Sequence, residues 1–239
     1  MLKRIEPNNR TINVVVYGPP DSGKTMSWGT FSELFDPQQM FLLDAERGLL
    51  SLQGFDIQGC SISSMADAEE AVQWLMHSNE AKDIKLCGVD SLTKVADMCL
   101  LEEQQKGHAN KYKPYEEVYN RISSLVEKLK YIEGKHTYMT CRLDKVITEL
   151  GHVLHGPDMP GRQLSKYLLH EMDLVCCQRV WSTAAPSPSA DGLPSISKKR
   201  ALQTGEAEGY SARNRTGVAL SHFETINMAT LFSKIAKGA

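Results

Sequence analysis

The stretch from Thr11 to Thr25, TINVVVYGPPDSGKT, constrains the fold of this chain more than any other. It has an apolar run rich in β-branched residues, a turn rich in glycine and proline, and then a lysine and a threonine that open a predicted helix. Residues 18–25 fit the pattern G-x-x-x-x-G-K-[ST] of a phosphate-binding loop. Its glycines let backbone N–H groups converge on phosphate oxygens, and the positive end of the following helix faces the same anion. The sequence therefore predicts a site for a nucleoside triphosphate, which we take to be ATP.

The side chains of this loop have distinct expected tasks. Lys24 is expected to reach the β- and γ-phosphates, and the Thr25 hydroxyl is expected to bind Mg²⁺. The predicted nucleotide-binding residues are Gly18, Pro19, Pro20, Asp21, Ser22, Gly23, Lys24, Thr25 and Met26.

Length and charge limit the remaining possibilities. With 239 residues, 41% of them hydrophobic, the chain suits one sizeable α/β domain. The formal net charge of −2 gives no global field toward nucleic acid, so such binding would need local basic loops. The sequence has no membrane-spanning apolar run, and its six cysteines lack paired C-x-x-C spacing. We expect a cytoplasmic protein with reduced thiols and no membrane association.

Predicted strands and helices alternate along the chain, which is typical of a mostly parallel sheet with helices on both faces. The fold class is therefore α/β, with antiparallel strands added in the C-terminal half. We expect a single domain over residues 1–239, with an N-terminal arm at 1–11 and a mobile loop at 182–199. The expected strands are 13–17, 40–43, 84–90, 136–141, 173–181 and 200–203. The expected helices run from the phosphate loop to Phe35 and over 66–78, 91–105, 117–133, 163–172 and 226–237. A small hairpin is expected at 146–154.

Two acidic residues lie at the ends of predicted strands. Asp90 ends the apolar run IKLCGVD, as the acid that holds Mg²⁺ does in phosphate-loop ATPases, although such an Asp can also cap the next helix. Glu46 follows the next strand after the phosphate loop and is the candidate to orient the attacking water, with Asp44 as a possible metal partner. The alternative is an acidic loop in which Glu46 pairs with Arg47, and spacing alone does not separate the two.

Together, GPPDSGKT, FLLDAERG and GVDSLTKVA resemble the RecA family in residue type, spacing and order. The compact length resembles the RecA-like single-strand annealing ATPases of bacteriophages (Sak type). This resemblance implies a RecA-like ATPase core in which Glu46 is the catalytic base and Asp90 the Mg²⁺ acid. If the chain is phage-encoded, its compartment is the host cytoplasm.

The same resemblance implies binding of single-stranded DNA and assembly into a filament or ring with ATP at subunit interfaces. Segments 104–116 and 142–161 correspond to the two DNA-binding loops of the family. Arg213 and Arg215 resemble the residues that reach a neighbouring subunit's γ-phosphate and so take part in catalysis. The predicted DNA-binding residues are Lys106, Lys111, Tyr112, Lys113, Arg142, Lys145 and Arg162.

One position departs from the family. Cys141 stands where a Gln or His usually senses the γ-phosphate, and Arg142 is the possible substitute. Our first hypothesis is a DNA-stimulated ATPase that promotes annealing or strand exchange, with a single-strand-binding protein as a possible partner. The alternatives are a ring-forming RecA-core helicase or motor, and an ATP-gated DNA-processing interaction module with weak hydrolysis.

Overall fold

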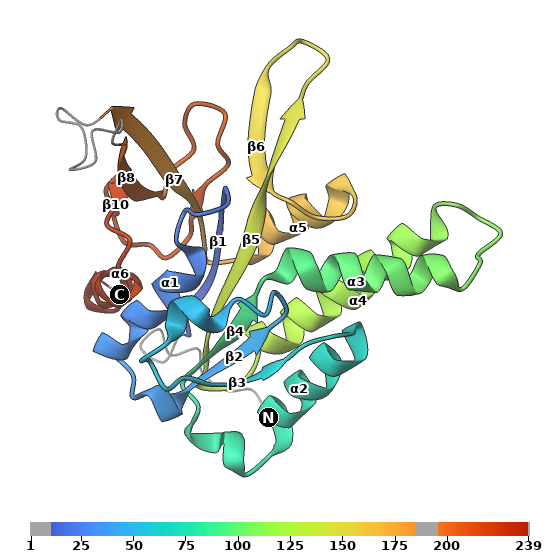
Figure 1. Ribbon diagram of the computed structural model, residues 1–239, viewed down its shortest axis with the longest axis horizontal. Coiled ribbons are helices and arrows are strands. Elements are labelled where there is room, and N and C mark those ends of the chain that lie inside the picture. Colours follow the sequence, from blue (N-terminus) through green and yellow to red (C-terminus); the bar gives the residue numbers. More distant parts are fainter. Residues whose placement is uncertain (1–10, 185–195, 239) are drawn as a thin grey trace, which may run out of the picture.

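A computed structural model describes residues 11–184 and 196–238, and one twisted sheet runs through its centre (Figure 1). The strand order is β10-β8-β7-β1-β5-β4-β2-β3, with β6 paired to β5 and β9 paired to β7. The strands from β7 to β3 in this order are parallel, whereas β6, β8, β9 and β10 pair antiparallel with their neighbours. The predicted α/β class, with antiparallel strands in the C-terminal half, is confirmed. The strands are β1 Asn13–Gly18, β2 Met40–Asp44, β3 Gln58–Ser61, β4 Leu86–Asp90, β5 His136–Ile147, β6 Val153–Pro157, β7 Leu174–Ala184, β8 Ile196–Gln203, β9 Arg213–Asn214 and β10 Phe223–Glu224.

Helices cover both faces of the sheet, as the alternating sequence pattern predicts (Figure 1). On one face, α2 (Met65–His77), α3 (Leu92–Gln105), α4 (Lys113–Lys130) and α5 (Arg162–Glu171) pack against every second residue of the strands. On the other face lie α1 (Lys24–Gly29) and α6 (Met228–Gly238). Short 3₁₀ turns occupy Thr30–Glu33, Pro37–Gln39, Leu49–Leu52 and Glu80–Asp83.

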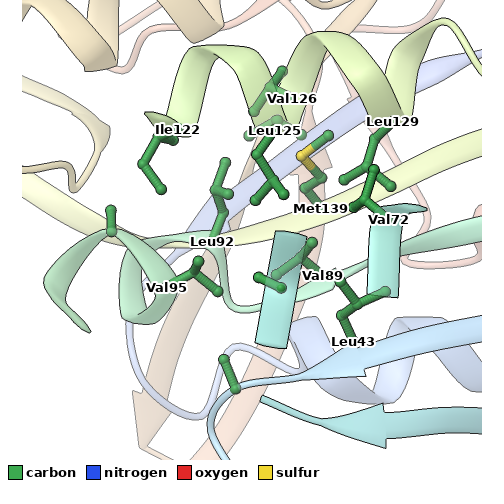
Figure 2. Close-up of a cluster of buried hydrophobic side chains, with 14 of the residues drawn as sticks. Leu43, Val72, Val89, Leu92, Val95, Ile122, Leu125, Val126, Leu129 and Met139 are labelled. Carbon is green, nitrogen blue, oxygen red and sulfur yellow. The ribbon is translucent and has the colours of Figure 1, made fainter. Parts of the chain in front are cut away.

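The apolar side chains of the central strands alternate between two cores. Val15 and Tyr17 belong to the core beneath α2 to α5, whereas Val14 and Val16 belong to the core beneath α1 and α6. Figure 2 shows the larger core, where Leu92 and Val95 of α3 and Leu125 of α4 lie close to the strands. All six residues of β1 are buried, so the strand that carries the phosphate loop is fixed on both faces.

Most predicted elements are present, but several bounds are wrong for identifiable reasons. The helix after the phosphate loop ends at Gly29 rather than Phe35. The hydroxyls of Ser27, Thr30 and Ser32 each donate to the carbonyl three residues earlier, which favours the tighter 3₁₀ turn seen at 30–33. Strand β3, with sequence QGCS, was not predicted because it is polar and lies at the sheet edge.

The second half differs mainly in the lengths of its elements. Helix α4 begins at Lys113 rather than 117, because Pro114 is tolerated in the first turn of a helix. The hairpin predicted at 146–154 is confirmed and longer, pairing from Leu143 with Pro157 to Ile147 with Val153. Of the loop expected at 182–199, residues 182–184 and 196–199 belong to β7 and β8, and 185–195 lie outside the described residues. Residues 1–10 of the expected arm also lie outside them.

The parallel pairing of β4 with β5 depends on the absence of a side chain at Gly88. A Cβ built there would lie 1.7 Å from the Tyr138 carbonyl oxygen. We therefore expect Gly88→Ala to lower the free energy of unfolding, measured by urea denaturation, by at least about 2 kcal/mol. Gly156→Ala is the matched control, because a Cβ at Gly156 meets no atom within 4 Å. Equal stability of the two variants would contradict this packing.

Candidate nucleotide site

The phosphate loop follows β1 directly, at the edge where the parallel strands end. Gly23 has φ of 97°, a left-handed conformation that favours glycine just before α1 begins. Gly18 is required for a close approach, since a Cβ there would lie 2.8 Å from the Gln178 carbonyl oxygen of β7. Gln178 is fully buried and its Nε2 donates to the Ser22 carbonyl at 2.7 Å. The backbone of the loop is thus held from β7, a contact that the sequence did not predict.

Lys24 turns its ammonium back into the loop. Its Nζ donates to the carbonyls of Gly18 at 3.0 Å and Pro19 at 2.9 Å. Burial lowers the pKa of Lys24, and the nearby carboxylates of Asp90 and Glu46 oppose that shift. The cation therefore lies within the predicted phosphate site, next to the two acids expected to act there.

Asp90 is the centre of the site and is almost completely buried. Its Oδ2 accepts a hydrogen bond from Thr25 Oγ1 at 2.6 Å, and its Oδ1 accepts one from the Thr140 hydroxyl of β5. Burial raises the pKa of Asp90, whereas the hydrogen bonds from Thr140 and Thr25 lower it. The sequence did not predict Thr140, whose role becomes visible only once β5 lies beside β4.

The oxygens of Thr25 and Asp90 suit Mg²⁺, a hard cation that is usually held by one or two carboxylates together with water and phosphate. Residues 11–184 and 196–238 contain no cluster of three or more acidic, His or Cys side chains of the kind that builds an all-protein metal cage. A metal that depends on the triphosphate for most of its ligands fits this donor set.

The alternative in which Asp90 caps α3 is wrong, because Ser91 is the N-cap and accepts from the Lys94 N–H.

Glu46 lies beside Asp90 through backbone and side-chain contacts. The N–H groups of Ala45 and Glu46 donate to the Asp90 carbonyl at 2.7 and 3.3 Å. The Ser91 hydroxyl donates to Glu46 Oε1 at 2.6 Å, so one carboxylate oxygen is fixed while the side chain stays exposed. The peptide bond between Asp90 and Ser91 is cis.

The two neighbours of Glu46 have structural tasks. Asp44 accepts the Arg47 N–H at 2.8 Å and closes the turn after β2, which commits one of its oxygens. Arg47 donates to Ser63, and no ion pair joins it to Glu46 within the described ranges. The pairing of Glu46 with Arg47, which the sequence left open, is therefore absent from this arrangement.

Neither predicted sensor candidate reaches Asp90. Cys141 is fully buried opposite Tyr17, and burial raises its thiol pKa to about 12. Arg142 lies opposite Gly18 in the sheet, but its guanidinium contacts Asp97 of α3 and Asp158 after β6. Thr140 is the side chain of β5 that contacts the site.

The predicted DNA-binding cations divide into two groups. Lys106, Lys113 and Arg142 are paired with acids, at 2.6 Å to Glu103, 2.8 Å to Glu117 and 3.2 Å to Asp158. In the part of the chain that the structure describes, the remaining predicted cations have no ion pair within 4.0 Å. These are Lys111, which lies over the Tyr112 ring at 5.1 Å, and Lys145 and Arg162.

Two segments predicted to bind DNA approach each other at the base of the β5–β6 hairpin. A Cβ built on Gly161 would lie 3.8 Å from Cδ1 of Tyr115 in α4. A cavity of about 820 Å³ lies between the hairpin and α5, and Arg162 contributes to its lining. The structure thus brings the start of α4 close to the second predicted loop, whereas Lys111 and Tyr112 lie on the exposed tip between α3 and α4 (Figure 1).

The structure places Arg213 and Arg215 away from the phosphate loop of their own chain. Strand β9 pairs with the first residues of β7, at the opposite end of the parallel strands from Gly18. Arg213 donates to the Leu169 carbonyl at 3.0 Å and Arg215 to the His170 carbonyl at 2.6 Å, which satisfies the C-terminal end of α5. A catalytic task for either arginine therefore requires a neighbouring subunit.

Comparison with known proteins agrees with this geometry. Residues 10–216 match a family described as AAA domain. The chain belongs to this family of P-loop ATPases. No curated protein matches this AAA-domain chain. A solved ATPase from the type III secretion system of pathogenic bacteria is similar in fold, with a TM-score of 0.50 at 16% identity over 70% of this chain.

This AAA-domain chain spans 51% of the length of that secretion ATPase, and at this identity the likeness shows the fold alone. The fold of this chain is a RecA-like P-loop fold, as the sequence predicts. None of the helices within residues 11–184 and 196–238 is both long and apolar enough to cross a membrane.

The hydrogen bond from Thr140 to Asp90 predicts a pH effect. Thr140 stabilises the ionised carboxylate, so Thr140→Val raises the pKa of Asp90 and leaves less of it ionised at mildly acidic pH. We expect the acidic limb of the ATPase pH profile to move to higher pH. The Mg²⁺ concentration for half-maximal rate should rise roughly tenfold, the cost of one hydrogen bond to a charged group.

Thr137→Val is the matched control, because Thr137 is buried on the same strand and donates to the Leu129 carbonyl away from the site. Its pH profile and Mg²⁺ dependence should match those of the wild type. If Thr140→Val also left both unchanged, the assignment of Asp90 to the metal would be wrong.

Proposed function

We propose that this ATPase domain hydrolyses ATP with Mg²⁺, binds single-stranded DNA, assembles through ATP-containing interfaces and promotes DNA annealing or strand exchange. The observation that carries the proposal is the position of Glu46. Its carboxylate is fixed by Ser91 beside Asp90, at the edge of the sheet where the parallel strands end and the phosphate loop begins. An exposed, oriented carboxylate next to a phosphate site is suited to act on water.

Each residue of the site then has a defined task. Lys24 would leave the carbonyls of Gly18 and Pro19 for the phosphates, and Thr25 with Asp90 would hold Mg²⁺. The metal, when bound, neutralises charge that develops on the phosphate oxygens. Glu46 orients the attacking water and accepts its proton, and Ser91 keeps the carboxylate in position for that transfer.

The DNA-binding part of the proposal is supported by topology. Strand β5 pairs with β1 up to Arg142 beside Gly18, and then continues as the first strand of the β5–β6 hairpin. The hairpin, which carries Lys145, therefore projects from the same edge that carries the phosphate loop (Figure 1). A change in the loop on nucleotide binding would reach the hairpin through one continuous strand.

The assembly part is supported by the positions of Arg213 and Arg215. Both lie at the opposite end of the parallel strands from the phosphate loop. A subunit that presents this end to the phosphate loop of the next subunit would complete its site in trans. An arginine supplied in this way can add roughly 10³ to 10⁵ in rate, so hydrolysis would depend on assembly.

A second candidate function keeps nucleotide binding and dispenses with DNA-coupled turnover. It is favoured by the burial of Cys141 and by the pairing of Arg142 with Asp97 and Asp158, which leave the usual sensor position without a free polar side chain. In that case ATP would switch an interaction with another DNA-processing protein. Turnover that does not respond to DNA would select this candidate.

Glu46→Gln tests the proposed chemistry. The amide keeps the shape and the contact with Ser91 but cannot accept a proton, so we expect kcat to fall at least about 100-fold. ATP affinity should stay within a few-fold of the wild type, and complexes with ATP and DNA should last longer. Glu80→Gln, at an exposed glutamate in a 3₁₀ turn, is the control. Wild-type turnover in Glu46→Gln would remove Glu46 from the mechanism.

A further inference from the structure

An aromatic ladder crosses the molecule from β6 to β10. The ladder consists of His155, Tyr210, Arg179, Trp181, Phe223 and His222. The ring centroids lie 4.1 Å apart for His155 and Tyr210, 5.4 Å for Trp181 and Phe223, and 4.7 Å for Phe223 and His222. Arg179 joins the two parts, with its Cζ 3.8 Å from the centroid of the Tyr210 ring and 5.2 Å from that of Trp181. The site described above uses none of these residues.

The inner end of the ladder is fixed by hydrogen bonds. Arg179 donates to Gln203 Oε1 at 2.7 Å and to Glu208 Oε2 at 2.9 Å. Tyr210 is held through its neighbour, because the Ser211 carbonyl accepts from the Tyr17 hydroxyl at 2.7 Å. The guanidinium of Arg179, next to which Trp181 packs, and the ring of Tyr210 are therefore held in place before any ligand binds.

The outer end is exposed and aromatic. Trp181 of β7 and Phe223 of β10 have 36% and 40% of their surface exposed, and their rings meet across β8. Trp181 lies directly opposite Lys199 in the β7–β8 pair, so both side chains are on one face of the sheet. Lys198 and Arg200 are also exposed on β8 and add positive charge to this edge.

This combination fits a polyanion whose bases are unpaired. Single-strand binding surfaces combine cations along the backbone with aromatic rings on which successive bases stack. Paired bases within a duplex are already stacked and do not offer their faces to such rings. Strand β7 runs past Gln178 beside the phosphate loop, so the β7–β8 arm, which carries Trp181, projects from the same sheet edge as the β5–β6 hairpin (Figure 1).

We propose that Trp181 and Phe223, with Lys199, form a base-stacking site for single-stranded DNA on the surface formed by β7, β8 and β10, in addition to the two predicted loops. The inference rests on the proposed function and names a place where the DNA is held. A strand bound there would lie on the face of β7 that carries Arg179, which Tyr210 links to His155 of the β5–β6 hairpin. Its bases would stack on Trp181 while Lys199 contacts a phosphate.

Tryptophan fluorescence provides the test, because the three tryptophans differ in environment. Trp28 is fully buried, and Trp74 packs on Phe41 at 4.8 Å, whereas Trp181 is exposed. With ATP and Mg²⁺, a labelled dT oligomer of about 16 nucleotides should bind and quench wild-type fluorescence. Quenching should disappear in Trp181→Phe, with affinity within a few-fold, and persist in the control Trp74→Phe.

Two further variants measure how much Trp181 and Lys199 contribute to the affinity for single-stranded DNA. Trp181→Ala should weaken binding, measured by anisotropy of the labelled oligomer, by roughly 5- to 150-fold. Lys199→Ala should reduce the slope of log affinity against log salt by about 0.7, the effect of losing one phosphate contact on a single strand. The basal ATPase rate of both variants, measured without DNA, should match that of the wild type.

The outcomes separate this inference from the proposed function. Tight binding of dT with full quenching in Trp181→Phe, or unchanged affinity in Trp181→Ala, would overturn the stacking site and leave the proposed function standing. Equal quenching by a duplex of the same length would also overturn it. Absence of dT binding by the wild type would overturn the proposed function and this inference together.

Discussion

The buried carboxylate of Asp90 is the interaction on which the site depends. A buried carboxylate is costly unless its oxygens accept hydrogen bonds, and here Thr25 and Thr140 supply them from two other elements. The carbonyl of Asp90 also accepts the two N–H groups that hold Glu46 in place. Residue 90 therefore joins the phosphate-loop helix, β5 and the turn after β2 in one network. This network joins β4 to the two strands beside it, β2 and β5.

The sequence predicted the parts of this arrangement that depend on local pattern. The phosphate loop, the three parallel strands that carry the motifs, and the β5–β6 hairpin all follow from apolar runs and turn residues near each other in the chain. Glu46 and Asp90 were found as acids at the ends of strands, and the sheet brings them together. Their chemical tasks remain proposals, although the alternatives in which Asp90 caps α3 and Glu46 pairs with Arg47 are absent from the structure.

The contacts that the sequence could not predict join distant segments. Thr140 lies 50 residues from Asp90, and Gln178 lies 156 residues from Ser22, so no local pattern signals either contact. The acid partners of Lys106 and Lys113 lie within one helical turn, but composition alone suggested a free basic loop. Helix α1 is short because hydroxyl groups in its last turn compete for the backbone, an effect that apolar periodicity does not report.

Strand β7 contacts both the nucleotide site and the proposed DNA surface. Gln178 holds the phosphate loop, and Arg179, the next residue, stacks on Tyr210 in the aromatic ladder. Because adjacent residues of a strand point to opposite faces, this strand contacts the nucleotide site on one face and the proposed DNA surface on the other. A link of this kind would allow nucleotide and DNA to influence each other without a polar side chain at Cys141.

ATP hydrolysis with and without a long poly-dT strand, at two protein concentrations, tests the central claim most directly. Poly-dT should raise the rate, and the stimulated rate should grow more than in proportion to protein, because assembly on DNA would complete each site with an arginine from a neighbour. Slow turnover that ignores DNA and scales linearly with protein would contradict the account.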